Sequence, residues 1–158
     1  MHPDTAGVDD ATGPAAISVE RRIEWGDTDA SGHYHYAAAL RLFESAETTL
    51  LERLGLRDLI YARLPRVGMR IEFREWLVFG DIVTVGVRVE QMGRTSVTYA
   101  FTILRDAKTC ASGEVTAVLL KDPLGRPTPW PDEYRARLSA AGPQASECLS
   151  TPVLERKE

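Results

Sequence analysis

Two aspartates in a glycine-bounded loop carry the most distinctive chemistry in this sequence. Asp27 and Asp29 lie between Gly26 and Gly32, and an apolar helical pattern begins a few residues later. A carboxylate beside a helix N-terminus can attack a carbonyl carbon or deprotonate water, while the unpaired N–H groups of the first helical turn polarise the carbonyl oxygen. This combination of groups predicts acyl-transfer chemistry.

The side chains near these carboxylates have structural interpretations as well. Asp27 is interpreted as a cap or Asx-turn residue that holds the loop. His33 and His35 resemble part of a metal site, but side chains two positions apart at a helix start diverge, so we expect no metal. One histidine is expected to line the acyl pocket or relay a proton, and the other to be a partly exposed loop residue.

Composition limits the class of protein. The chain has 158 residues, 44% hydrophobic and 27% charged, which predicts one globular domain. With a net charge of −4 and no long basic run, nucleic acid is not an expected partner. Cys110 and Cys148 are far apart and fit no metal spacing, which favours a reducing cytoplasm. We find no signal-peptide pattern and no apolar run of membrane-spanning length, so no membrane association is expected.

Hydrophobic periodicity divides the chain into elements. Residues 1–16 are predicted to be a disordered leader, 17–141 the folded domain, and 142–158 a flexible tail. A long helix from 34 or 35 to 54 ends before Gly55, and shorter helices are expected at 57–64 and 131–140. Alternation of apolar residues predicts strands at 17–25, 66–75, 82–90, 97–104 and 112–120.

One long helix followed by four strands in succession predicts an α+β fold. The short connections between the later strands make them antiparallel neighbours. A single helix cannot cover both faces and both edges of a five-stranded sheet, so we expect a homodimer or a homotetramer. Trp76 and Trp130 are expected to pack at a sheet edge or subunit seam. Glu44 and Glu47 interrupt the apolar pattern of the long helix. They are expected either to form an exposed polar stripe or to line the pocket wall, where they would be reserve candidates for the catalytic base.

This order of elements and the loop Ile23-Glu24-Trp25-Gly26-Asp27-Thr28-Asp29-Ala30-Ser31-Gly32 resemble the hot-dog-fold thioesterases of the 4-hydroxybenzoyl-CoA thioesterase group. The resemblance covers residues 18–138 and implies hydrolysis of an acyl thioester without a cofactor. It implies that Asp29 is the catalytic carboxylate, acting either as a nucleophile or as a general base. It also implies that the backbone N–H of Tyr36 polarises the thioester carbonyl.

The resemblance also suggests which residues contact the substrate. Gly32, His33 and His35 fall in the loop that leads into the helix. Arg94, Thr95 and Ser96 fall at the turn where relatives that bind aromatic acyl groups carry several basic residues for the CoA phosphates. Because only Arg94 is basic here, an acyl-carrier-protein substrate stands beside acyl-CoA as an expected partner.

Two other functions fit the same fold. A hot-dog dehydratase or enoyl hydratase commonly pairs Asp and His five positions apart, and no such pair exists in this loop. A non-catalytic acyl-thioester binding module is the third interpretation, and the presence of Asp29 argues against it.

Overall fold

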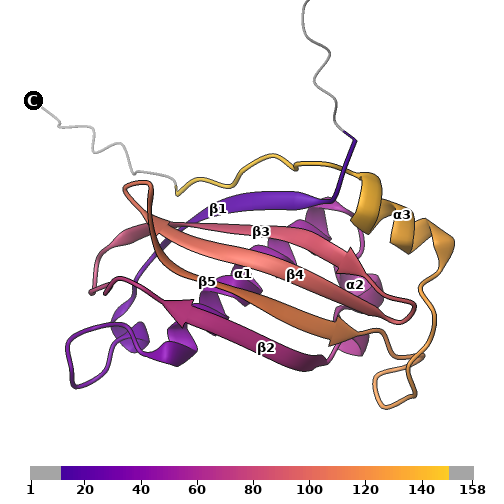
Figure 1. The fold of residues 1–158 in the computed structure, drawn as a ribbon, viewed down its shortest axis with the longest axis horizontal. Helices are drawn as coiled ribbons and strands as arrows, with labels where there is room; N and C mark the ends of the chain where they lie inside the picture. The colour runs from indigo at the N-terminus through magenta and orange to yellow at the C-terminus, as the bar shows by residue number, and fades with distance from the viewer. Residues whose placement is uncertain (1–11, 150–158) are drawn as a thin grey trace, which may run out of the picture.

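The chain forms one antiparallel sheet with a long helix packed against one of its faces (Figure 1). The computed structural model describes residues 12–149. The strands lie in the order β1-β3-β4-β5-β2, and each neighbouring pair is antiparallel. Along the chain the elements are β1 (Ala16–Arg22), η1 (Trp25–Asp27), α1 (Tyr36–Arg53), α2 (Arg57–Ile60), η2 (Tyr61–Arg63), β2 (Arg66–Phe73), β3 (Ile82–Met92), β4 (Ser96–Arg105), β5 (Lys108–Val118) and α3 (Asp132–Ala140).

The period-two pattern decides which face of the sheet meets α1. The residues of β3 between the buried positions face the opposite side of the sheet. The buried positions are all valines: Val83, Val85, Val87 and Val89. On β4, Tyr99 and Phe101 pack against Phe43 of α1, with ring centroids 5.7 and 5.3 Å apart. Helix α1 packs mainly over β1 and β3. The edge strand β2 is left with half-exposed apolar side chains.

The helix ends follow local signals that the sequence carries. At the start of α1, the His35 Nδ1 accepts a hydrogen bond from the Ala37 N–H at 3.2 Å. Gly55, with a φ of +68°, takes the left-handed conformation that ends the helix as predicted. The predicted helix 57–64 divides into α2 and η2. Among residues 12–149, we find no helix whose length and apolarity would suffice to cross a bilayer.

The first strand is shorter than its alternation predicts. Strand β1 ends at Arg22, whereas the pattern extends to residue 25. Ile23 instead exchanges backbone hydrogen bonds with the turn before β3, donating to Asp81 O at 2.8 Å and accepting from Gly80 N–H at 2.9 Å. The next residues form η1, where the Glu24 N–H donates to the Asp27 carboxylate at 2.8 Å. The loop therefore begins earlier than predicted because a side chain captures the backbone.

The folded part also begins earlier than the predicted leader boundary of 16. Ala15 is fully buried. Its N–H donates to Leu138 O at 3.0 Å, and its carbonyl accepts from Val89 N–H at 2.9 Å. Residues 1–11 of the predicted leader lie outside the described residues.

The segment after Gly142, predicted as a flexible tail, runs alongside β1 for its first residues. The Gln144 N–H donates to Ala16 O at 2.7 Å, and the Glu20 N–H donates to Glu147 O at 2.8 Å. Glu147 also pairs with Arg21 at 2.8 Å. This segment covers the β1 edge, which leaves β2 as the uncovered edge within the described sheet. Residues 150–158 of the predicted tail lie outside the described part of the chain.

Candidate active site

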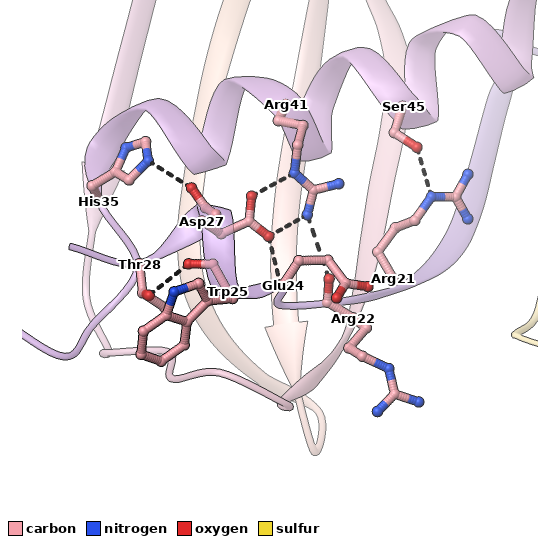
Figure 2. Close-up of polar contacts among 10 residues, drawn as sticks. Arg21, Arg22, Glu24, Trp25, Asp27, Thr28, His35, Arg41 and Ser45 are labelled. Carbon is pink, nitrogen blue, oxygen red and sulfur yellow. Dashed lines mark hydrogen bonds and ion pairs between the residues drawn. The ribbon is translucent and has the colours of Figure 1, made fainter.

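The predicted loop is fixed to α1 by an ion pair, shown in Figure 2. Asp27 is only 4% exposed, and Arg41 of α1 donates to its two carboxylate oxygens from Nε and Nη2, each at 2.5 Å. Burial alone raises the pKa of Asp27, but the hydrogen bonds from Arg41 and the Glu24 N–H hold that pKa below its ordinary value. Asp27 therefore has the structural role that the sequence favours.

Asp29 has a different environment two residues later. Its side chain is exposed, and its Oδ1 accepts hydrogen bonds from the Ser31 N–H at 2.8 Å and the Ser31 hydroxyl at 2.5 Å. The Ser31 hydroxyl, followed by the Ser31 N–H, lowers the pKa of Asp29. Within residues 12–149, no hydrogen bond engages Oδ2 of Asp29. Asp29 is thus a carboxylate at neutral pH, with one oxygen fixed and the other available.

A short hydrogen-bonded chain connects Asp29 to the helix entrance. The Ser31 hydroxyl lies 3.2 Å from His33 Nδ1, so Asp29, Ser31 and His33 are linked in that order. The His33 ring packs on the Trp76 ring, with centroids 4.0 Å apart and an interplanar angle of 31°. Trp76 lies in the connection that follows β2, so this contact ties the loop to the exposed edge of the sheet.

The N-terminus of α1 provides an unpaired backbone donor. His35 is the N-cap, and its own N–H donates to Asp27 O at 2.8 Å. Tyr36 is the first helical residue and is 77% exposed, and nothing in the described part of the chain accepts a hydrogen bond from its N–H. His35 thus caps α1, whereas the His33 ring packs on Trp76 and lies beside the Ser31 hydroxyl.

A hollow of about 230 Å³ opens beside this helix end. It lies between the start of α1 and the end of β2, and its walls include His33, Tyr36, Phe73, Arg74 and Trp76. Two contacts of Tyr34 hold the walls together: its N–H donates to Leu77 O at 2.8 Å, and its ring meets the Phe73 ring edge-on at 5.8 Å. Two of the sequence-predicted residues, His33 and Tyr36, thus line one hollow together.

Three predicted substrate contacts lie elsewhere in the same chain. Arg94, Thr95 and Ser96 form the turn between β3 and β4, at the opposite end of the sheet from the Asp29 loop. Strand β3 alone has 11 residues, so it separates the two ends by about 33 Å. Trp130 is buried against this turn, and its indole N–H donates to Ser96 O at 2.9 Å. Within one chain, these residues therefore do not lie beside Asp29, and their contact with the substrate stays a prediction.

The two reserve glutamates do not behave as a single stripe. Glu44 is exposed, whereas Glu47 is fully buried and forms an ion pair with Arg66 of β2. Burial raises the pKa of Glu47 to about 7, although the Arg66 charge opposes this shift. The Arg66 guanidinium also lies over the Phe43 ring, 5.8 Å from its centroid. Neither glutamate lines the hollow.

Several residues of this site are absent from the sequence prediction, among them Ser31, Phe73 and Arg74. Ser31 had a local signal, because a serine two positions after an aspartate commonly closes an Asx turn. Phe73 and Arg74 had none, since only the pairing of β2 with β5 brings the end of β2 to the helix entrance.

Known proteins share this fold. A family model described as the Thioesterase-like superfamily matches residues 23–138. A predicted thioesterase from Bacillus stearothermophilus is 26% identical, with a TM-score of 0.71, and the match covers 78% of this chain and 93% of that one. A thioesterase from Thermus thermophilus, solved with coenzyme A and Zn, is 27% identical, with a TM-score of 0.70 and coverage of 77% and 90%.

A more distant structure shows the fold alone. It is a 1,4-dihydroxy-2-naphthoyl-CoA thioesterase from Synechocystis, 21% identical, with a TM-score of 0.70 and coverage of 78% and 95%. The predicted hot-dog fold, with one long helix against a five-stranded antiparallel sheet, is confirmed.

Proposed function

The chain belongs to the thioesterase-like superfamily, and on this premise we propose that it hydrolyses an acyl-CoA thioester at the junction of the Asp29 loop and α1. The observation that carries the proposal is the unpaired Tyr36 N–H, which borders a hollow that is linked through His33 and Ser31 to the Asp29 carboxylate. A thioester carbonyl in the hollow would accept from this N–H, where the helix N-terminus favours negative charge.

The low pKa of Asp29 makes it a base or a nucleophile rather than an acid. In one route, Asp29 removes a proton from water as the water oxygen adds to the carbonyl carbon. In the other, Asp29 adds directly and forms a mixed anhydride that water then hydrolyses. In both routes the oxyanion faces the Tyr36 N–H, the C–S bond breaks as the oxyanion collapses, and the thiolate takes a proton from solvent.

A second copy of the chain would complete the site. Strand β2 is the edge of the sheet that the segment after Gly142 does not cover. It carries three apolar residues that are 46–62% exposed: Val67, Met69 and Phe73. Antiparallel pairing of two β2 strands about a two-fold axis at Ile71 sets Arg70 opposite Glu72 of the second copy. Axes at the neighbouring Arg70 would instead oppose like charges, which disfavours that register. We therefore propose a homodimer through β2, centred on Ile71.

This pairing gives the turn at Arg94 a role in substrate binding. The two-fold axis reverses the strands of the second copy, so the Arg94 end of its sheet comes to the Asp29 end of the first. Its β4 strand would lie three strand spacings from β2, about 14 Å away. Arg94, Thr95 and Ser96 of one copy would then contact the phosphate-bearing end of the CoA whose thioester lies in the hollow of the other.

Release of free thiol from a panel of acyl-CoAs tests the activity. Asp29→Asn should lower kcat at least ~100-fold, as expected for the loss of a reacting acid–base group. The matched control is Asp58→Asn on α2, which alters an exposed carboxylate distant from the loop. Near-normal thiol release by folded Asp29→Asn would remove Asp29 from the mechanism. A change in enoyl absorbance without thiol release would indicate a hydratase, and neither signal would indicate a binding module.

A further inference from the structure

The Ser31 hydroxyl makes three hydrogen bonds near the entrance to α1, although Ser31 is an exposed residue. Its oxygen lies 2.5 Å from Oδ1 of Asp29 and 3.2 Å from Nδ1 of His33, and it accepts from the His33 backbone N–H at 3.3 Å. A hydroxyl group has one hydrogen to donate and two lone pairs with which to accept. These three contacts therefore use the hydroxyl completely.

The direction of each of these hydrogen bonds follows from the charge of Asp29. The Ser31 hydroxyl and then the Ser31 N–H lower the pKa of Asp29, so its side chain is a carboxylate at neutral pH and can only accept. The hydroxyl hydrogen must then lie toward Asp29, and both contacts with His33 must end on the lone pairs of the serine oxygen. Nδ1 of His33 therefore carries a hydrogen, and in the neutral ring Nε2 carries none.

This arrangement leaves one atom free on each neighbour of Ser31. On Asp29, Ser31 occupies Oδ1 with two hydrogen bonds, and no other side chain or backbone group of residues 12–149 bonds to this carboxylate. On His33, whose ring lines the hollow and packs on Trp76, Nε2 has no hydrogen-bond partner in the described part of the chain. A reacting group contributes most when its orientation is fixed before the substrate arrives, and for Asp29 the group that fixes it is Ser31.

We propose that Ser31 is a positioning residue of the hydrolysis, which makes Oδ2 the reacting oxygen of Asp29 and fixes His33 as the Nδ1–H tautomer. The proposal rests on the hydrolysis proposed above, with Asp29 as the base or nucleophile. Without the hydroxyl, rotation about the Cβ–Cγ bond of Asp29 exchanges its two oxygens more freely, because only the Ser31 N–H then holds one of them. His33 also loses the acceptor that keeps a hydrogen on Nδ1, so Nε2 is no longer fixed as the acceptor nitrogen of the ring.

Substitutions at Ser31 separate this role from a purely local one in the loop. An Asx turn needs only the bond from the Ser31 N–H to Oδ1 of Asp29, which every side chain except proline preserves. Ser31→Ala therefore keeps the turn and removes the hydroxyl, whereas Ser31→Thr retains a hydroxyl. Ser45→Ala on α1 is the matched control, because the Ser45 hydroxyl accepts from Nε of Arg21 at 2.6 Å and lies on the helix rather than in the loop.

The first measurement is the pH profile of thiol release from an acyl-CoA, taken as initial rates after dilution from neutral stocks into buffers of about pH 3 to 7. Asp29 must be unprotonated to react, so activity falls as pH drops through its pKa. Ser31→Ala removes the largest cause of the lowered pKa, which should move this acid limb to higher pH and reduce kcat on the plateau about tenfold. Ser31→Thr should show the native profile, and Ser45→Ala should change neither quantity. An unmoved acid limb in Ser31→Ala, or a shifted one in Ser31→Thr, would overturn the positioning role.

The second measurement is ¹⁵N NMR of the imidazole rings, which needs no substrate. At about pH 9 histidine side chains are neutral, and the nitrogen shifts then report which ring nitrogen carries the hydrogen. His33, identified by the loss of its signal in His33→Gln, should carry it on Nδ1 in the native protein and lose this preference in Ser31→Ala. A hydrogen on Nε2 in the native protein would overturn the hydrogen-bond direction. Absence of thiol release from every acyl-CoA would overturn the proposed hydrolysis itself, whereas the His33 tautomer tests the Ser31 contact in either case.

Discussion

Replacing Asp27 by Asn should destabilise the protein without removing a reacting group. The substitution keeps an oxygen for the Glu24 N–H but removes the charge that Arg41 engages at two oxygens. Loss of one partner from a fully buried ion pair costs about 3–5 kcal/mol, and exposed pairs contribute about 0–1 kcal/mol. Asp27 is buried, whereas the Arg41 side chain is 44% exposed and stays hydrated when unpaired. We therefore expect a loss of about 2 kcal/mol in the free energy of unfolding.

Urea denaturation measures this loss, and a double-mutant cycle assigns it to the pair. For a chain of this length, about 2 kcal/mol corresponds to a fall of roughly 4–8 °C in Tm. Arg41→Gln alone should cost a similar amount, and the Asp27→Asn, Arg41→Gln double variant should cost far less than the sum of the two. Additive losses would refute the claim that the two side chains stabilise the loop through each other.

The contrast with Asp29 sharpens this prediction. Asp29→Asn alters an exposed carboxylate, so its Tm should stay within about 1 °C of the native protein while kcat falls. The pH dependence has a matching sign: the pKa of Asp27 is depressed in the folded state, so its stabilising effect is present above its ordinary value of 3.8 and is lost as pH falls below it. A large fall in Tm for Asp29→Asn, with little change for Asp27→Asn, would mean that the two roles are reversed.

Three further predictions concern other parts of the molecule. Burial raises the pKa of Glu47 from 4.5 to about 7, so folding favours the protonated acid and the free energy of unfolding should decline as pH rises between these values. When that free energy is measured in urea at about pH 5 and about pH 7.5, Glu47→Gln should remove up to about 3 kcal/mol of the difference between the two pH values. Truncation after Gly142 removes the hydrogen bonds of Gln144 and Glu147 to β1 and should lower the free energy of unfolding by about 2 kcal/mol. An unchanged urea midpoint would contradict the assignment of this segment to the β1 edge. Arg94→Ala should raise KM for acyl-CoA about tenfold and leave kinetics with acyl-pantetheine, which lacks the nucleotide phosphates, unchanged; equal effects on both substrates would exclude a phosphate contact.

Local patterns in the sequence were sufficient for much of the fold. Alternating valines identified β3, the apolar helical spacing identified α1, and Gly55 marked its end. The spacing of the residues between Gly26 and Gly32 predicts that this loop carries the site. These features depend on residues within a turn or two of each other, so the local periodicity of side-chain directions is sufficient to reveal them.

Contacts between distant segments could be decided only in the tertiary structure. Nothing local links Asp27 to Arg41, sets Glu47 against Arg66, or brings Phe73 to the entrance of α1. The same holds for the C-terminal segment, whose mixed polar composition predicts disorder although its backbone is hydrogen-bonded along β1. Periodicity records which side of an element is apolar, but strand order and register determine which other element it meets. The sequence by itself thus determined the elements and the carboxylate loop, while the path of the chain decided which aspartate is clamped and where the hollow opens.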